Sequence, residues 1–273
     1  SNGCEASLED LKAFLLSIGA RPLASCSSLA VCFPKPLFGR NYDFFYRLKR
    51  RAESCLTMPK GGYWSIGNSD VFIGREDGIN EAGLAVSMAF VAPKEIKPGI
   101  NFALAVRAIL DRCSSVAEAI RLLSNARLST TNNYLLLDKD GDAAAVEASP
   151  NKIAVRKSEG GILVVTNHFT HRGMGDEENV NERPPDSVMR YEKIMSMIGA
   201  YAGKVDLKSA IKVLSDHKGL VCSHVKEIRL GTLWSMVAFP SERALWMAEG
   251  HPCKAHYMED LRLKRALAKR VQE

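Results

Sequence analysis

A cysteine, an arginine and an aspartate stand at a spacing that suits nucleophilic chemistry. Cys26 precedes a short apolar run, Leu29–Phe33, and Arg40 and Asp43 follow Cys26 by 14 and 17 residues. A strand, a turn and a returning strand would bring both charged side chains back beside Cys26. A guanidinium close to sulfur favours the thiolate, which is the reactive form of cysteine. The same spacing also suits a core cysteine beside an ordinary Arg–Asp ion pair, so both interpretations stay open.

The motifs of several large enzyme classes are missing from the sequence. It has no phosphate-binding loop, no dinucleotide-binding glycine pattern, no Gly-x-Ser-x-Gly elbow and no His-Glu-x-x-His zinc motif. The nucleophile is therefore sought among the cysteines.

The composition is that of an ordinary globular protein. The chain has 273 residues, of which 46% are hydrophobic and 25% are charged. No apolar stretch reaches the roughly 18 residues that a membrane-spanning helix needs, so no membrane span is expected. The net charge of +6 permits a nucleic-acid partner without implying one. Seven irregularly spaced cysteines indicate a reducing compartment, and we expect a cytoplasmic protein with at least one thiol free for chemistry.

Hydrophobic periodicity predicts alternating groups of helices and strands. The expected order is a helix at 7–18, strands at 29–33, 38–42, 63–66, 71–73 and 84–90, two helices within 99–124, strands at 134–137, 143–148, 152–156 and 161–166, a loop at 171–185, helices at 187–200 and 206–216, strands at 232–239 and 243–249, and a basic helix at 256–271. This order predicts an α+β protein in which two sheets pack together with helices outside them, in one domain.

Several short stretches, spread from residue 26 to about residue 253, match a family pattern in order. They are Cys26–Leu29, Gly39–Phe44, Asp77–Leu84, Thr131–Tyr134, Val165–Phe169, Ser187–Tyr191, Cys222–His224, Thr232–Val237 and Gly250–Cys253. With these stretches the sequence resembles the N-terminal-nucleophile hydrolases of the choloylglycine hydrolase and penicillin acyltransferase group. No single stretch is decisive, but their joint order is specific, and the later ones are more similar to the acyltransferase branch.

The resemblance implies a four-layer αββα sandwich, in which two mainly antiparallel sheets stack between layers of helices. It also implies that the chain cuts itself between Ser25 and Cys26, so that Cys26 becomes the first residue of the active enzyme. Residues 1–25, which begin with a stretch similar to a protease scar, would then be a pro-segment, and residues 26–273 a single catalytic domain. Relatives often have glycine where this chain has Ser25, which leaves the rate of self-cleavage open.

The resemblance also assigns roles around the nucleophile. The Cys26 sulfur attacks the carbonyl of a linear amide and forms a thioester, which water or an amine then resolves. The freed α-amino group, with an unperturbed pKa of ~7.7–8.0, takes the thiol proton at neutral pH. Asp43 would orient that amino group, and Arg40 would hold the thiolate.

Three further residues are candidates for the same site. Asn167, at the end of an expected strand, and Asn80, in a glycine-rich turn, would donate amide hydrogen bonds to the oxyanion. Asparagines in turns are also common turn formers, which is the alternative for both. Arg229 matches the position of a late arginine in the family, and Lys226 competes with it for that match.

We therefore expect a hydrolase or acyltransferase that acts on linear amide carbon–nitrogen bonds through an N-terminal cysteine. Its partner would be a small acyl-amide substrate, and neither a cofactor, a metal nor nucleic acid is expected. The acyl group, the amine and the formation of a homo-oligomer stay open.

Three alternatives compete with this interpretation. A zinc site could form from histidines and cysteines late in the chain, although their spacing is not that of common zinc modules: His217, Cys222, His224, His251, Cys253 and His256. The basic stretches Arg47–Arg51 and Arg262–Arg270 could bind nucleic acid or an anionic surface in a protein without amidase activity. Leu23–Cys26 is similar to a bacterial lipobox, but the segment before it is too charged and too short for a secretory signal.

Overall fold

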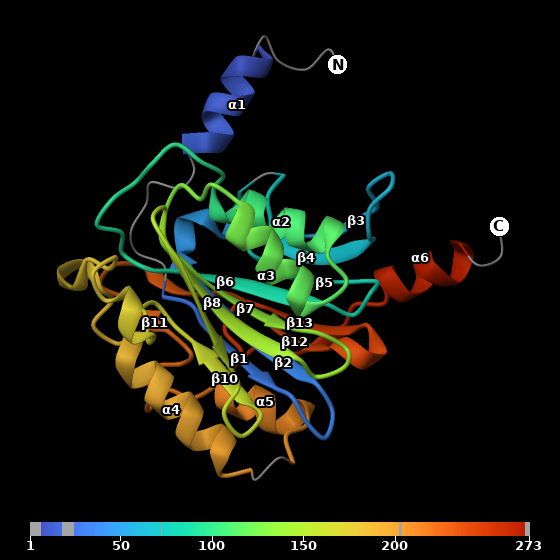
Figure 1. Ribbon diagram of the computed structural model, residues 1–273. Helices are drawn as coiled ribbons and strands as arrows, with labels where there is room; N and C mark the ends of the chain where they lie inside the picture. Colours follow the sequence, from blue (N-terminus) through green and yellow to red (C-terminus); the bar gives the residue numbers. More distant parts are fainter. Residues whose placement is uncertain (1–6, 18–24, 72, 202–203, 271–273) are drawn as a thin grey trace.

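The computed structural model describes residues 7–17, 25–71, 73–201 and 204–270 (Figure 1). Within these residues the strands form two seven-stranded sheets in which neighbouring strands are antiparallel. The first sheet has the order β10-β1-β2-β12-β13-β14, with β11 paired to β12, and the second has the order β3-β4-β5-β6-β7-β8-β9.

The strands of the first sheet come from both ends of the chain. They are β1 (Ser27–Val31), β2 (Leu37–Phe45), β10 (Ile162–Val165), β11 (His224–Val225), β12 (Leu230–Phe239), β13 (Ala244–Glu249) and β14 (Met258–Glu259). The second sheet is built from the middle of the chain, by β3 (Glu53–Thr57), β4 (Ser65–Ser69), β5 (Asp77–Asn80), β6 (Ala85–Phe90), β7 (Asn132–Leu137), β8 (Ala143–Ala148) and β9 (Ile153–Lys157).

Helices cover the outer face of each sheet and complete four layers (Figure 1). The second sheet is covered by α2 (Phe102–Arg112) and α3 (Val116–Asn125), and the first by α4 (Ser187–Gly199) and α5 (Leu207–Leu214). This arrangement confirms the predicted αββα sandwich. The remaining helices are α1 (Leu8–Ser17), α6 (Arg262–Arg270) and the short 3-10 helices η1 (Tyr46–Arg51), η2 (Arg172–Met174), η3 (Val180–Glu182) and η4 (Pro240–Glu242). None of the helices in the described part of the chain is long and apolar enough to cross a membrane.

Capping residues set where the helices of the outer layer begin. The side chain of Asn101 accepts a hydrogen bond from the backbone of Leu104 at the start of α2, and Ser115 accepts one from Glu118 at the start of α3. These side chains satisfy backbone N–H groups that have no partner inside the helix.

The side chains of the first sheet point alternately into two hydrophobic cores, one on each face of the sheet. Ala30 and Phe38 pack between the sheets, whereas Leu29 and Leu37 pack with residues of α4 and α5. Successive residues on a strand point to opposite faces, so residues two apart share one. Cys26 accordingly belongs to the inter-sheet core.

The observed elements differ from the predicted ones in several places. Val71 and Ile73 lie in a bend and a turn rather than in a strand. The sequence does not predict β3 or β5, because Glu-Ser-Cys-Leu-Thr and Asp-Gly-Ile-Asn contain few residues that favour strands. β3 and β5 pair with β4, one on each side of it, and this pairing overrides the weak local preference. The basic C-terminal helix begins at Arg262 rather than at residue 256.

The predicted pro-segment is described only in part. α1 confirms the predicted helix, and the Ser7 hydroxyl caps it by accepting a hydrogen bond from the backbone of Asp10 at 3.1 Å. The stretch similar to a protease scar and residues 18–24, which include the predicted end of the helix, lie outside the described residues.

Candidate active site

The pairing of β1 with β2 places Arg40 beside Cys26. The register sets Ser28 opposite Arg40, so Arg40, Ser28 and Cys26 share the inter-sheet face. Nη2 of Arg40 donates a hydrogen bond to Sγ of Cys26 at 3.6 Å. Both side chains are completely buried. The strand–turn–strand arrangement expected from the spacing is therefore present.

The second sheet holds Arg40 in place. Nη1 of Arg40 lies 3.2 Å from Oδ2 of Asp77 and also donates to the carbonyl oxygen of Glu76. Asp77 accepts further hydrogen bonds from Nε1 of Trp234 at 2.8 Å and from Nδ2 of Asn68 at 2.6 Å. Because both oxygens of Asp77 have donors, its carboxylate is held in place and orients the guanidinium.

Burial controls the acidity of the Cys26 thiol in the intact chain. Loss of solvent raises the pKa of Cys26 to about 11; the Arg40 charge opposes this rise, and the Asp43 carboxylate adds to it. The thiol is therefore protonated at neutral pH. A base has to take the proton before the sulfur can attack a carbonyl.

Asp43 lies on the opposite face of β2 from Arg40, because the two residues are three positions apart. Its carboxylate is completely buried, and neither oxygen receives a hydrogen bond of ordinary geometry within the described residues. Burial raises the pKa of Asp43 to about 7, while the Thr232 hydroxyl and the Arg190 guanidinium lower it in part. Thr232 lies directly across from Asp43, beside a β-bulge in β12.

The backbone at the predicted cleavage point runs alongside Asp43. The amide nitrogen of Ser25 donates a hydrogen bond to the carbonyl oxygen of Asp43 at 3.2 Å, which continues the β1–β2 pairing beyond Ser27. Arg40 thus faces the Cys26 sulfur on one side of the sheet. On the other side lies a buried carboxylate that receives no hydrogen bond of ordinary geometry from the described residues.

Arg190 of α4 donates hydrogen bonds both to the Asn167 side chain and to the backbone of Cys26. Nη1 of Arg190 donates to the carbonyl oxygen of Cys26 at 2.6 Å and to Oγ of Ser27 at 2.9 Å. Its Nη2 donates to Oδ1 of Asn167 at 2.9 Å, and its Nε donates to Asp186 at 2.9 Å. A planar guanidinium can serve these four acceptors at once and so fixes their relative positions.

Asn167 follows β10 as predicted, and its side chain is part of this network. Nδ2 of Asn167 donates to the carbonyl oxygen of Phe90 at 2.8 Å. A side-chain amide carries two N–H groups. The described residues supply one acceptor for them, the carbonyl oxygen of Phe90.

The structure does not bring Asn80 into this cluster. Its Nδ2 donates to the carbonyl oxygens of Leu110 and Cys113 at 3.0 and 2.7 Å, and its Oδ1 accepts from the backbone of Ala82 and Leu84 at 3.1 and 3.0 Å. Along β5 the side chain of Asp77 faces the other sheet, so the side chain three positions later faces the helices. Asn80 closes the turn after β5 and fastens it to the end of α2.

Arg229 also stands apart from the buried cluster. It is exposed, has a backbone φ of 53°, and lines a shallow pocket with Phe45, Arg47 and Ile228 at the start of β12. Its competitor Lys226 is exposed as well. Within the described residues no hydrogen bond or ion pair joins either side chain to Cys26.

Neither Arg190 nor Asp77 stands out in the sequence as a candidate site residue. Both lie in stretches that carry the family resemblance, but the remaining signal is weak. The spacing of Asp186 and Arg190 is that of an i,i+4 ion pair, which is common on exposed helix surfaces. Only the packed structure shows that Arg190 is completely buried against the start of β1.

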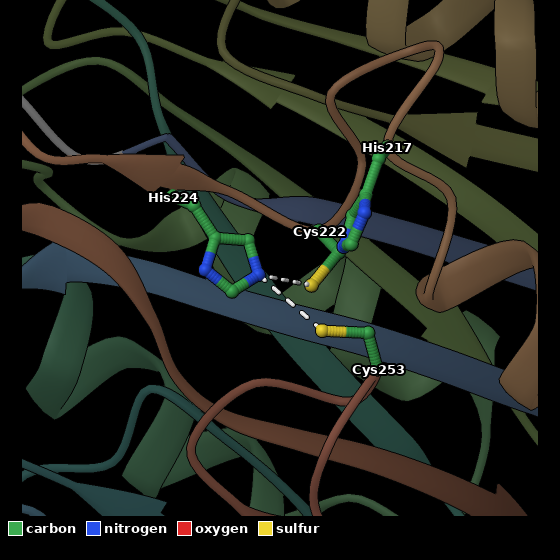
Figure 2. Close-up of side chains that lie close together, drawn as sticks. All are labelled: His217, Cys222, His224 and Cys253. Carbon is green, nitrogen blue, oxygen red and sulfur yellow. Dashed lines mark hydrogen bonds between the residues drawn. The ribbon is translucent and has the colours of Figure 1, made fainter.

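A second group of reactive side chains lies at the edge of the first sheet. His217, Cys222, His224 and Cys253 hold their potential ligand atoms within 4.8 Å of one another (Figure 2). Of the other histidines that the sequence suggests for zinc, His251 stacks on His224, and His256 is exposed.

Two stacked antiparallel sheets between helical layers form the sandwich of the N-terminal-nucleophile hydrolase class. Within that class, residues 33–254 match the family described as acyl-coenzyme A:6-aminopenicillanic acid acyl-transferase, and the chain belongs to this family. Its members act on acyl amides, as hydrolases or as acyltransferases.

Three solved structures illustrate the likeness in fold. A variant of the conjugated bile acid hydrolase from Clostridium perfringens is similar with a TM-score of 0.63 and 17% identity, over 86% of this chain and 92% of that one. The N-acylethanolamine-hydrolyzing acid amidase ortholog of Caenorhabditis elegans is similar with a TM-score of 0.58 and 16% identity, over 79% of this chain and 93% of that one. Penicillin V acylase from Agrobacterium tumefaciens is similar with a TM-score of 0.55 and 17% identity, over 82% of each chain. In a comparison of sequences, no curated protein matches this chain.

Proposed function

We propose that this protein is an acyl-amide hydrolase or acyltransferase whose nucleophile is Cys26, freed when the chain cuts itself between Ser25 and Cys26. The observation that carries the proposal is the completely buried carboxylate of Asp43 near the cleavage point, to which the described residues donate no hydrogen bond of ordinary geometry. Buried carboxylates are normally paired. An α-ammonium group on Cys26, created by cleavage, would be that partner.

Self-cleavage needs only the residues at this point and one water molecule. The Cys26 sulfur adds to the carbonyl carbon of Ser25, the carbon–nitrogen bond breaks, and the departing nitrogen takes the thiol proton to become the α-amino group. Water then hydrolyses the thioester, which leaves a carboxylate on Ser25 and restores the thiol. The hydrogen bond from Arg190 to the Cys26 carbonyl oxygen holds the backbone in position during these steps.

The same groups then serve an external amide. The α-amino group takes the thiol proton and later gives it to the leaving amine. Asp43 orients the amino group, Arg40 stabilises the thiolate, and the second N–H of Asn167 stabilises the oxyanion. Asn80 is assigned to the turn after β5, because its amide is already used there.

The substrate class follows from the chemistry that the relatives share. The three solved relatives are named for conjugated bile acids, N-acylethanolamines and penicillin V, all of which carry an acyl group on an amide nitrogen. We propose that this protein cleaves an acyl amide of the same general kind.

The test combines intact mass with N-terminal sequencing of the purified protein. Wild type is expected to show a new terminus at Cys26, whereas Cys26→Ala remains uncut and does not turn over acyl amides. Cys32→Ala is the matched control, because Cys32 is a second buried cysteine near the same strand and should leave cleavage unchanged. Amide turnover by Cys26→Ala, or a wild-type chain that is uncut and yet active, would contradict the proposal.

A further inference from the structure

The second cluster is assembled from three separate segments near the edge of the first sheet. His217 follows α5, Cys222 and His224 lead into β11, and Cys253 lies in the turn after β13. Figure 2 shows the two sulfur atoms and the two imidazole rings directed toward a common point. Residues 36 positions apart along the chain thus meet through the fold alone.

Two of the six distances between potential ligand atoms match those of a tetrahedral metal site. Sγ of Cys222 and Sγ of Cys253 lie 3.4 and 3.3 Å from Nε2 of His224. With Zn–S bonds of about 2.3 Å and Zn–N bonds of about 2.1 Å, a tetrahedral site has S–N edges of about 3.6 Å. The cluster is therefore close to the dimensions that one ion needs.

Hydrogen bonds hold the ligand-bearing loops in shape. The backbone of Cys222 donates to the carbonyl oxygen of Asp216 at 2.9 Å, and the backbone of Leu220 donates to that of His217 at 3.2 Å. His224 is paired with Gly231 of β12. The His251 ring stacks on His224 with centroids 3.8 Å apart and limits its rotation. Such support around the ligands is typical of metal sites.

We propose that His217, Cys222, His224 and Cys253 bind one Zn²⁺ ion in a closed tetrahedral site. Two thiolates and two imidazoles are a zinc ligand set, whereas Mg²⁺ and Ca²⁺ require oxygen ligands. Four protein ligands leave no coordination position for a substrate, so the ion is structural. These four are among the six residues that the sequence suggests for zinc, and the set leaves out His251 and His256.

The ion would stabilise the loop around Ser223, which packs on β12 beside the proposed catalytic centre. Ser223, between two of the ligands, accepts a hydrogen bond from the backbone of Thr232 at 3.3 Å, and its own backbone donates to the Thr232 hydroxyl at 3.4 Å. Thr232 lies opposite Asp43. The metal site would thereby fix the loop that packs on β12 at the position of the buried carboxylate, whether or not the proposed amidase activity is correct.

The first experiment measures metal content. The full chain is produced with added zinc, purified without a metal-affinity column and analysed by plasma mass spectrometry. About one zinc per chain is expected for wild type, for His256→Ala and for Cys55→Ser, and less than about a tenth for Cys222→Ser and Cys253→Ser. His256 and Cys55 are the controls, because one lies near the cluster and the other lies on β3 in the second sheet.

A second experiment does not depend on the folding of the variants. Wild-type protein is stripped of metal under reducing conditions and titrated with Co²⁺. Intense visible bands of a tetrahedral cobalt–thiolate centre, complete at one equivalent and displaced by Zn²⁺, are expected, and the melting temperature should rise as the ion binds. Absence of these bands in reduced wild type overturns the proposal. So does zinc that stays bound in both serine variants, and so does a stable Cys222–Cys253 disulfide whose reduction yields no metal binding.

Discussion

The guanidinium of Arg190 and the carbonyl oxygen of Cys26 form a 2.6 Å hydrogen bond that links helix α4 to the first residue of the proposed mature enzyme. The same guanidinium holds Asn167 at 2.9 Å. One buried side chain therefore sets the distance between the proposed nucleophile and the proposed oxyanion donor. Arg190 is a positioning residue in this scheme, because it acts through its neighbours.

Replacement of Arg190 by lysine should distinguish the positioning role of the guanidinium from the effect of its positive charge. Arg190→Lys keeps the charge, but a single nitrogen cannot hold four acceptors. We expect kcat to fall by about 10- to 100-fold with a smaller change in KM, because misplacement by a fraction of an ångström is costly for catalysis. Steady-state kinetics and the rate of self-cleavage measure the effect, and the exposed Arg121→Lys is the control. Unchanged kcat in a folded Arg190→Lys protein would contradict this role.

Asp43→Asn should have opposite effects before and after cleavage. In an uncut Cys26→Ala chain, the pKa of Asp43 is raised to about 7, so the folded chain holds the proton more tightly than the unfolded chain does. Stability is then lost as pH rises from about 4 to 7, and Asp43→Asn should recover up to about 4 kcal/mol at pH 8 but almost nothing near pH 4. Urea denaturation at both pH values measures the free energy of unfolding.

In the cleaved enzyme the same substitution should instead remove the partner of the α-ammonium group. We expect Asp43→Asn to lower turnover by at least about 100-fold. If Asp43→Asn stabilises the uncut Cys26→Ala chain by the same amount at every pH, the charge of Asp43 does not cause the gain in stability.

Arg40→Met should be strongly destabilising because it leaves Asp77 buried without its cation. We expect a loss of about 3–5 kcal/mol in the free energy of unfolding. Adding Asp77→Asn should restore at least about 1 kcal/mol of it. The comparable pair Arg107 and Asp111 is only partly buried, so Arg107→Met should cost less than about 1 kcal/mol. Urea denaturation in the uncut Cys26→Ala background compares the four chains, and equal costs at the two pairs would be the contrary result.

Asn80→Ala should reduce stability without a matching loss of catalysis. Its side chain makes four hydrogen bonds that close the turn after β5. Their loss should lower the free energy of unfolding by about 2–4 kcal/mol. Below the melting temperature, kcat/KM should stay within about threefold of wild type. A fall of 10² or more with full stability, the effect of losing an oxyanion donor, would return Asn80 to the active site.

Much of the fold could be predicted from the sequence, because its signals are local. Periodicity predicted most helices and strands, and the spacing of Cys26, Arg40 and Asp43 predicted a shared strand end. The joint order of short stretches predicted the family. β3 and β5 were missed because pairing with β4, a long-range interaction, forms them.

Tertiary structure decided which of the candidate residues meet. The strand period put Arg40 and Asp43 on opposite faces of β2, but only the packing of the second sheet put Asp77 against Arg40, and only the docking of α4 buried Arg190 against Cys26. The same holds for Asn80, which the fold directs toward α2, and for the four histidines and cysteines that converge at the edge of the first sheet. Sequence periodicity fixes the face on which a side chain lies; which faces come into contact depends on contacts between segments far apart in the chain.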